Sequence, residues 1–147
     1  MNTNEEQNPE QFQQALNILD DMSCEKIEQM TTLKINNMKQ TIMDELELDP
    51  ETRKDYLVKL KDYKYIDDIS DLRYGAFIMW IPILELNTIT LQKCGIICDI
   101  QLGDEHVLIT CKNYMHRHYT FRMDECLVFQ KLSNQEKIII QILDQIK

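Results

Sequence analysis

The sequence predicts an α+β fold with N-terminal helices, a small five-stranded antiparallel barrel or strongly bent sheet, and a C-terminal helix. Three observations predict it. Residues 10–48 contain neither glycine nor proline, and their apolar residues recur mainly at steps of three and four. Five short apolar or alternating runs follow between Arg73 and Leu132. A capping box then begins at Ser133 and marks the start of a last helix.

The composition of the 147-residue chain excludes several classes of protein. A hydrophobic content of 44% is enough for one domain with an appended element. No run approaches the ~20 apolar residues that span a bilayer, and the first ten residues are polar and acidic, unlike a secretory signal. Five cysteines, an odd number, indicate free thiols in a reducing compartment. We therefore expect an intracellular protein that is not secreted and has no membrane partner.

The charge is divided unevenly along the chain. Residues 1–72 contain 8 Lys and Arg against 17 Asp and Glu, whereas residues 73–147 contain 8 of each, so the first part carries the whole net charge of -9. Excess acid repels nucleic acid and attracts a basic partner, although acidic helix faces are commonly only solvated. We expect an acidic helical arm at 1–48, followed by a unit at 49–147 that contains a helix, the barrel and the C-terminal helix.

The first helix is expected to start at the cap, proline and acid of residues 8–10. Irregular spacing at 20–23 predicts a break, so the arm forms either one long helix or a helical hairpin. Its apolar stripe needs a partner, which is a second copy of the chain, the barrel, or the other half of the arm. A second start signal at Asp49 predicts a shorter helix that ends near Lys64, with residues 65–72 as a connector.

The sheet is expected to be built from the five runs after this connector. Gly95 indicates a bulge or a sharp bend in the second run. Short turns between the runs predict a meander in which successive antiparallel strands are neighbours. The helix that starts after Ser133 has an apolar face and is expected to plug or flank the barrel. The five expected strands are 76–83, 91–102, 106–112, 116–123 and 126–131.

Motifs for catalysis, cofactors or metals are not found. Gly75, Gly95 and Gly103 are the only glycines, too few for a phosphate-binding loop, and no serine lies in a glycine-flanked nucleophile elbow. The spacing of the cysteines and histidines does not match a zinc site. We therefore expect no enzyme activity, no catalytic residue, no cofactor and no metal.

One segment is both basic and aromatic, the hairpin at 112–122. A strand that starts at His116 would place Thr120 and Arg122 on one face and Arg117 and Tyr119 on the other. Such a surface can contact phosphates and stack on bases, although an ordinary exposed strand has the same pattern. Aromatic residues, Trp80 among them, can alternatively gather as a cage for a methylated cation. The candidate binding surface consists of Lys112, Tyr114, Arg117, Tyr119, Arg122 and Trp80.

Three segments carry a resemblance to known proteins: residues 71–81 (DLRYGAFIMWI), 95–97 (GII) and 129–133 (FQKLS). They resemble small uncharacterised proteins of nucleocytoplasmic large DNA viruses, and the region 71–146 resembles SH3-like or Tudor-like barrels. The resemblance implies a virus-encoded accessory or virion-associated protein, in the cytoplasm of the infected cell or in the virion, with no catalytic residues. Met79 stands where such barrels are expected to carry a basic residue.

Two functional hypotheses follow. The first is a non-enzymatic protein-interaction or structural module that forms a homodimer or binds a protein partner through its acidic helical arm. The alternative is a nucleic-acid-binding SH3-like barrel that uses the basic aromatic hairpin 112–122.

Overall fold

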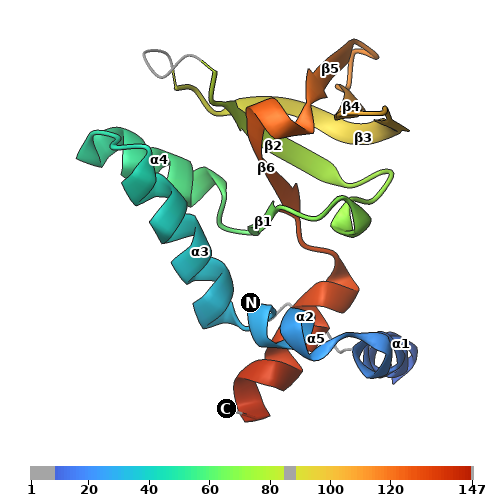
Figure 1. Cartoon of the computed structure of the whole chain (residues 1–147). Coiled ribbons are helices and arrows are strands. Elements are labelled where there is room, and N and C mark those ends of the chain that lie inside the picture. The colour runs from blue at the N-terminus through green and yellow to red at the C-terminus, as the bar shows by residue number, and fades with distance from the viewer. Residues whose placement is uncertain (1–8, 85–88, 147) are drawn as a thin grey trace. The chain divides into compact units, whose positions relative to one another are not determined.

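The computed structural model describes residues 9–84 and 89–146 and confirms the α+β class (Figure 1). Within these residues, no helix combines the length and the apolar character needed to cross a membrane. The described helices are α1 (Pro9–Asp21), α2 (Cys24–Gln29), α3 (Thr32–Glu45), α4 (Pro50–Lys59), α5 (Asn134–Ile146) and the short 3-10 helices η1 (Ile69–Asp71) and η2 (Met123–Glu125). The described strands are β1 (Tyr63–Ile66), β2 (Phe77–Pro82), β3 (Gln92–Leu102), β4 (Val107–Lys112), β5 (His118–Arg122) and β6 (Cys126–Lys131).

The chain forms two compact units. Their boundaries differ from the one expected after residue 48. The helical unit consists of the residues up to Met38 together with those from Leu132 onward. The sheet unit extends from Lys39 to Lys131. The C-terminal helix α5 therefore belongs with the N-terminal helices, because its apolar face is buried in the core of the helical unit.

The expected break at 20–23 is present, and the arm contains a second break that the sequence did not indicate. The side-chain oxygen of Ser23 accepts a hydrogen bond from the backbone N–H of Lys26 and so caps α2. α2 ends after one and a half turns, and α3 begins at Thr32. The Thr32 backbone N–H and hydroxyl donate to the carboxylate of Asp144 in α5 at 3.0 and 2.6 Å. The Asn8 start signal lies outside the described residues.

The apolar stripe of the arm is covered in part by the other half of the arm, one of the three expected partners, and in part by α5, which was not among them. Side chains from α1, α3 and the turn between α2 and α3 share one core with α5. This core removes the unpaired stripe that motivated a dimer through the arm. Its buried members are Ala15, Met30, Ile35, Ile138, Ile139, Ile140 and Leu143.

Among the described residues the sheet has six strands in the order β1-β6-β2-β3-β4-β5, and all neighbours are antiparallel. The expected meander is confirmed for β2 to β5. It is wrong for β6, which returns across the sheet and pairs with both β1 and β2. The sequence also missed β1, because its four residues follow a helical stripe and find their partner more than 60 positions away in β6.

A closed five-stranded barrel is not formed by the described residues, because β1 and β5 are the two edges of the sheet. The sheet is nevertheless strongly bent, and a strongly bent sheet was the alternative that the sequence predicted beside a barrel. Trp80 of β2 stacks on Phe121 of β5 with ring centroids 4.3 Å apart. In a flat sheet the two intervening strands would separate β2 from β5 by about 14 Å. The ring contact therefore requires the sheet to fold back over its own inner face.

Gly95 lies at a bulge, as its sequence position indicated. The pairing of β2 with β3 changes register between Ile78 and Met79, opposite Gly95. A Cβ atom at Gly95 would lie 2.1 Å from the carbonyl oxygen of Lys112, so only glycine fits there. This close approach lets β3 bend between its pairing with β2 and its pairing with β4.

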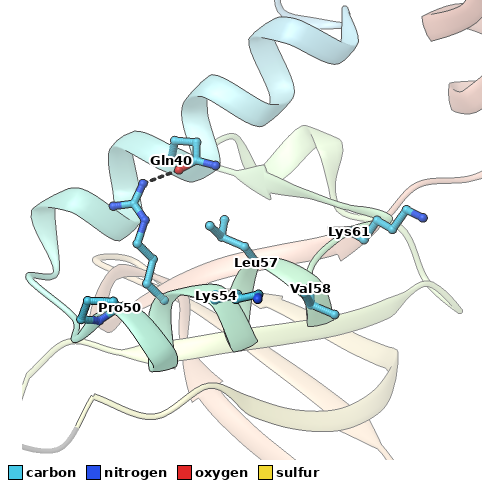
Figure 2. A pocket seen from close by; sticks show the side chains of 7 residues that line it. Gln40, Pro50, Lys54, Leu57, Val58 and Lys61 are labelled. Carbon is cyan, nitrogen blue, oxygen red and sulfur yellow. Dashed lines mark hydrogen bonds between the residues drawn. The ribbon is translucent and has the colours of Figure 1, made fainter.

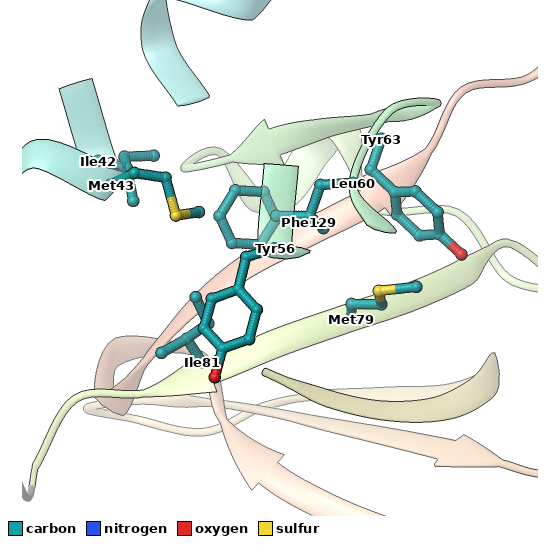
Figure 3. Packing of buried hydrophobic residues seen from close by; sticks show 8 residues of the cluster. All are labelled: Ile42, Met43, Tyr56, Leu60, Tyr63, Met79, Ile81 and Phe129. Atoms are coloured by element: carbon teal, nitrogen blue, oxygen red, sulfur yellow. The ribbon is translucent and has the colours of Figure 1, made fainter. Parts of the chain in front are cut away.

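The two faces of the sheet have separate cores. Ile78 and Trp80 point to the inner face, where they pack with Ile97, Ile109 and other residues of the bent sheet. The alternate residues of β2 point to the outer face, which α3 and α4 cover (Figure 3). The buried residues of this outer core are Ile42, Met43, Tyr56, Leu60, Tyr63, Met79, Ile81 and Phe129.

Candidate functional site

The expected binding surface is only partly brought together by the structure. Trp80 is buried, with 8% of its surface exposed, and its ring lies against Phe121 in the inner core. Tyr114, by contrast, is 91% exposed at the turn between β4 and β5, and Tyr119 is 45% exposed. An aromatic cage that combines Trp80 with these tyrosines has no support from this arrangement.

The turn of the β4–β5 hairpin is closed by Asn113. Its side-chain carbonyl oxygen accepts hydrogen bonds from the backbone N–H groups of Met115 and Arg117, at 2.9 and 3.0 Å. His116 adopts a left-handed backbone conformation with φ of 60°. The side chains of Tyr114 and Arg117 are consequently presented to solvent on a defined loop.

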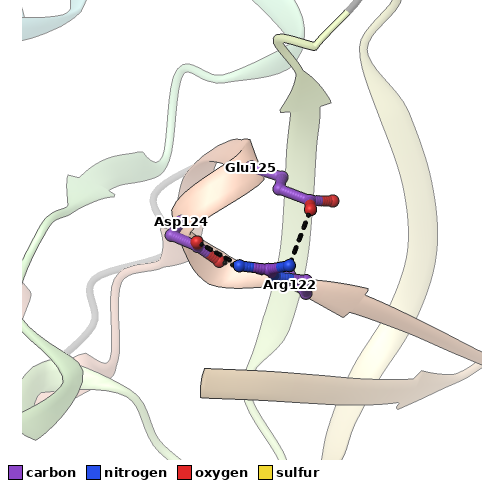
Figure 4. A network of polar contacts seen from close by, with 3 residues as sticks. All are labelled: Arg122, Asp124 and Glu125. Atoms are coloured by element: carbon purple, nitrogen blue, oxygen red, sulfur yellow. Dashed lines mark hydrogen bonds and ion pairs between the residues drawn. The ribbon is translucent and has the colours of Figure 1, made fainter. Parts of the chain in front are cut away.

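Arg122, the third cation of the hairpin surface, is engaged by two carboxylates (Figure 4). Its guanidinium donates to both carboxylate oxygens of Asp124, at 3.1 and 2.7 Å, and pairs with Glu125 at 3.2 Å. The hydrogen bond from Arg122 holds the pKa of Asp124 below its ordinary value. The cluster therefore has a net negative charge, and Lys112 and Arg117 are the hairpin cations left for a phosphate.

A hollow of about 320 Å³ lies where β2 and β5 end, and Cys126 lines it together with Trp80 and Phe121. Burial, helped by the neighbouring Glu125 and Asp124, raises the pKa of the Cys126 thiol to about 11. A nucleophilic cysteine requires the opposite shift. The hollow, which Thr120, Arg122 and Glu125 also line, thus offers a protonated thiol, which does not suit covalent catalysis.

Clusters of metal-binding side chains are also missing from the part of the chain that the structure describes. No group of three His, Cys, Asp or Glu residues is placed to hold an ion there. Four cysteines whose state is described, Cys24, Cys98, Cys111 and Cys126, form no disulfide.

A larger hollow, the α3–α4 groove, lies between the end of α3 and α4 (Figure 2). Its volume is about 720 Å³, within the range typical of binding pockets, ~300–1,000 Å³. The groove combines apolar and cationic side chains. The side-chain oxygen of Gln40 is its hydrogen-bond acceptor. The residues that line it are Gln40, Pro50, Arg53, Lys54, Leu57, Val58 and Lys61.

The start of α4 is fixed by local capping. Asp49 is the N-cap, and its carboxylate accepts a hydrogen bond from the backbone N–H of Thr52. Hydrogen bonding to Thr52, from its side chain first and from its backbone N–H second, lowers the pKa of Asp49. Pro50 occupies the first turn, where its missing N–H costs nothing. The sequence predicted this start correctly, but the helix ends at Lys59 and not near Lys64.

The end of α4 is held by Lys39 of α3, the residue before Gln40. Only 3% of Lys39 is exposed, and its ammonium group donates to the carbonyl oxygens of Leu60 and Lys61 at 2.9 and 3.4 Å. Burial lowers the pKa of Lys39, and the nearby carboxylate of Asp62 partly opposes this shift. The cation satisfies carbonyl groups at the negative end of α4 and so fixes that end relative to α3.

The mouth of the groove is spanned by Arg53. Its guanidinium contacts the carboxylate of Asp44 and the side-chain oxygen of Gln40, both on α3. The hydrogen bond to Gln40 is the dashed line in Figure 2. Two other cations, Lys54 and Lys61, are exposed at the groove. The groove is therefore locally basic in a chain whose net charge is -9.

An exposed apolar residue lies between these lysines. Val58 has 66% of its surface exposed. It lies within α4, where a β-branched residue is slightly unfavourable for helix formation. Leu57, one position earlier, is half-buried and lines the groove between the helices. Sequence reasoning missed this site because it considered only where this helix begins and ends. The available signal was Val58, an apolar residue with Lys54 four positions before it and Lys61 three positions after it.

Comparison of the chain with known protein families, with curated proteins and with solved structures gave no match. The functional argument therefore depends on the geometry of the described residues.

Proposed function

We propose that this protein is a non-enzymatic protein-interaction module and that its binding site is the α3–α4 groove. The observation that carries the proposal is the exposed Val58 between Lys54 and Lys61, above a half-buried Leu57. An amphipathic helix that binds in a groove requires apolar side chains at its centre and compatible charges around them. The partner is a protein segment with an apolar side chain flanked by carboxylates.

The proposal keeps the protein-interaction role expected from the sequence and moves its surface. The stripe of the acidic arm is used internally, because α1 and α3 bury it against α5. The groove lies at the end of α3, where Gln40 faces α4. The role of a virus-encoded accessory or virion-associated protein is the part of the proposal that rests on the sequence resemblance alone.

A non-enzymatic role is supported by the structural roles of the serine and cysteine side chains that could act as nucleophiles. Ser23 caps α2, and Ser133 caps α5 by accepting from the backbone N–H of Glu136. The Glu136 carboxylate accepts from the Ser133 N–H in return, which completes the capping box. Cys126 retains its proton at neutral pH.

The proposal is tested by titrating the labelled protein with a synthetic amphipathic helix that has a leucine stripe flanked by glutamates. We expect NMR amide shifts at Gln40, Lys54, Val58 and Lys61, the residues that line the groove. The control peptide carries lysines in place of the glutamates and is expected to bind at least about tenfold more weakly. The double variant Lys54→Glu with Lys61→Glu is expected to reverse this preference. Equal binding of both peptides, or shifts confined to other surfaces, would refute the proposal.

A further inference from the structure

We infer that the open edge of β5 binds an extended segment of a partner protein, which adds to the sheet as an antiparallel strand with alternating apolar and polar side chains. β5 is one edge of the sheet, and β4 is the only described strand that pairs with it (Figure 1). Its residues His118, Tyr119 and Thr120 are exposed. The inference goes beyond the proposed function, because this edge shares no residue with the α3–α4 groove.

Two contacts of the β4–β5 hairpin show which way the backbone groups of β5 point. The backbone N–H of Asn113 donates to the carbonyl oxygen of Arg117 at 3.0 Å, so the backbone of Arg117 is directed at the first arm of the hairpin. The side-chain oxygens of Thr110 and Thr120 lie 2.9 Å apart. Such a close approach is typical of opposite residues that exchange no backbone hydrogen bonds.

The alternation of an antiparallel ladder then assigns the remaining residues of β5. Tyr119 and Phe121 exchange backbone hydrogen bonds with β4, whereas His118 and Thr120 direct their N–H and C=O groups to the open edge. Groups directed in this way are a template for a further strand. Edge strands are commonly protected by a lysine, a proline or a bulge. β5 has no lysine and no proline, and its pairing with β4 is regular.

The hollow at the end of β5 favours an apolar side chain in the added strand. Phe121 and Trp80 line it, and its charged members Arg122 and Glu125 pair with each other at 3.2 Å. Its volume of about 320 Å³ is at the lower end of binding pockets, ~300–1,000 Å³, which suits a side chain better than a whole small molecule. Opposite residues of an antiparallel pair share a face, so the residue opposite Phe121 lies on the side of these two rings.

Charges at the two ends of β5 set the direction of the added strand. At its end, Asp124 and Glu125 engage Arg122 and give this cluster a net negative charge. At its start lie Lys112 and the exposed Arg117. The N-terminal end of an antiparallel segment lies beside the end of β5. The complementary segment therefore begins with a basic residue and ends with an acidic one.

The first test adds the capped peptide Lys-Thr-Val-Thr-Val-Thr-Glu to the isotopically labelled full chain. With its valines opposite Tyr119 and Phe121, its last two threonines lie opposite Thr120 and His118 and direct their N–H groups at β5. We expect NMR amide shifts along β5. N-methylation of these two threonines is expected to weaken binding at least about tenfold, because the hydrogen bonds to the edge are lost.

The matched control is N-methylation of the two valines, whose N–H groups point away from β5. It is expected to change the affinity less than about twofold. Equal loss of affinity in the two methylated peptides overturns the inference, as do shifts confined to other surfaces. Shifts of the β5 amides with protein concentration, before any peptide is added, would identify a second copy as the occupant and would overturn the inference as well.

A further peptide tests the direction of the added strand. Exchange of its terminal lysine and glutamate places like charges at both ends of β5 and is expected to weaken binding at least about threefold at low salt. High salt is expected to remove this difference, because both contacts are exposed. Equal binding of the two peptides at low salt overturns the antiparallel direction.

The last test places proline in β5. Thr120→Pro removes an N–H directed at the open edge, so the chain is expected to stay folded and to bind the peptide at least about tenfold more weakly. His118→Pro repeats this test and keeps the contact of Thr120 with Thr110. Tyr119→Pro instead removes a hydrogen bond to β4 and is expected to melt about 10 °C lower than Thr120→Pro. Normal peptide binding by folded Thr120→Pro and His118→Pro variants overturns the inference, as does a Tyr119→Pro variant more stable than both.

Discussion

The α3–α4 groove and the β4–β5 hairpin each contain three cationic side chains, but they offer different surfaces. In the groove, Arg53 is engaged by α3, while Lys54 and Lys61 surround an exposed Val58. The cationic side chains of the groove lie next to apolar surface that is exposed to solvent. Burial of that surface contributes roughly 25 cal/mol per Å², which charge alone does not supply.

In the hairpin, Tyr114 and Tyr119 stay exposed, but the other aromatic side chain, Phe121, is stacked on Trp80 of β2 inside the bent sheet. Arg122 is neutralised by Asp124 and Glu125. The comparison teaches that a basic aromatic sequence indicates binding only when its cations lack acidic neighbours and lie next to exposed apolar surface. Three changes test this difference, from the largest expected effect to the smallest.

Removal of the Trp80 ring is expected to have the largest effect. Trp80→Ala deletes a buried ring and its 4.3 Å stack on Phe121, so we expect a loss of about 3–5 kcal/mol in the free energy of unfolding. Urea denaturation measures it. The control Tyr114→Ala removes a ring that is 91% exposed and is expected to change stability by less than about 0.5 kcal/mol. Equal, small effects of the two substitutions would mean that the sheet does not close over Trp80.

Lys39→Met tests the support of the groove and is expected to have an intermediate effect. The methionine keeps the length of the side chain but leaves the carbonyl oxygens of Leu60 and Lys61 without this donor. We expect a loss of about 1–3 kcal/mol at neutral pH. Lys34→Met on the exposed face of the same helix is the control, with an expected change below about 0.5 kcal/mol.

The pH dependence of Lys39 provides a second readout. Because burial lowers the pKa of Lys39, the folded chain releases this proton at a lower pH than the unfolded chain, whose lysine has the ordinary value of 10.5. Between the two pKa values only the unfolded state is protonated, so this residue makes stability rise with pH there. The wild-type chain should show this contribution and Lys39→Met should not. Identical pH profiles would contradict the burial of a titrating lysine at this position.

Local signals in the sequence predicted much of the fold. Asp49 with Pro50, and Ser133 with Glu136, marked helix starts correctly because capping depends on residues within one turn. Gly95 marked the bulge because its missing Cβ is required locally. These features need no knowledge of distant contacts.

Features that depend on distant contacts escaped the sequence reading. β1 exists because Tyr63–Ile66 pairs with β6, and α5 covers the N-terminal helices although more than 100 residues separate them. The groove lies between consecutive helices, but it was also missed, since it requires α3 to lie opposite α4 and the sequence does not show how the two helices pack. Periodicity reports which side chains seek burial, but it does not identify the element that buries them.

Removal of the carboxylates that pair with Arg122 is expected to have the smallest effect of the three changes. It tests the alternative function, in which the hairpin binds nucleic acid. Asp124→Asn with Glu125→Gln removes both carboxylates that engage the guanidinium. Binding of a fluorescein-labelled oligothymidine, measured by anisotropy, is expected to be absent in the wild-type chain. In the double variant it becomes detectable at low salt, with at most one additional ion released.

A matched control separates local release of Arg122 from the change in net charge. Asp104→Asn with Glu105→Gln neutralises two exposed carboxylates in the turn between β3 and β4, so the net charge changes equally. We expect no binding in this control, because it leaves the Arg122 cluster intact. If the wild-type chain already bound the oligonucleotide, and Arg117→Ala removed that binding, the hairpin would be a phosphate-binding surface despite the pairing of Arg122. The described residues would then offer a partner two basic surfaces, the groove and the hairpin, and the contrast between the two regions would fail.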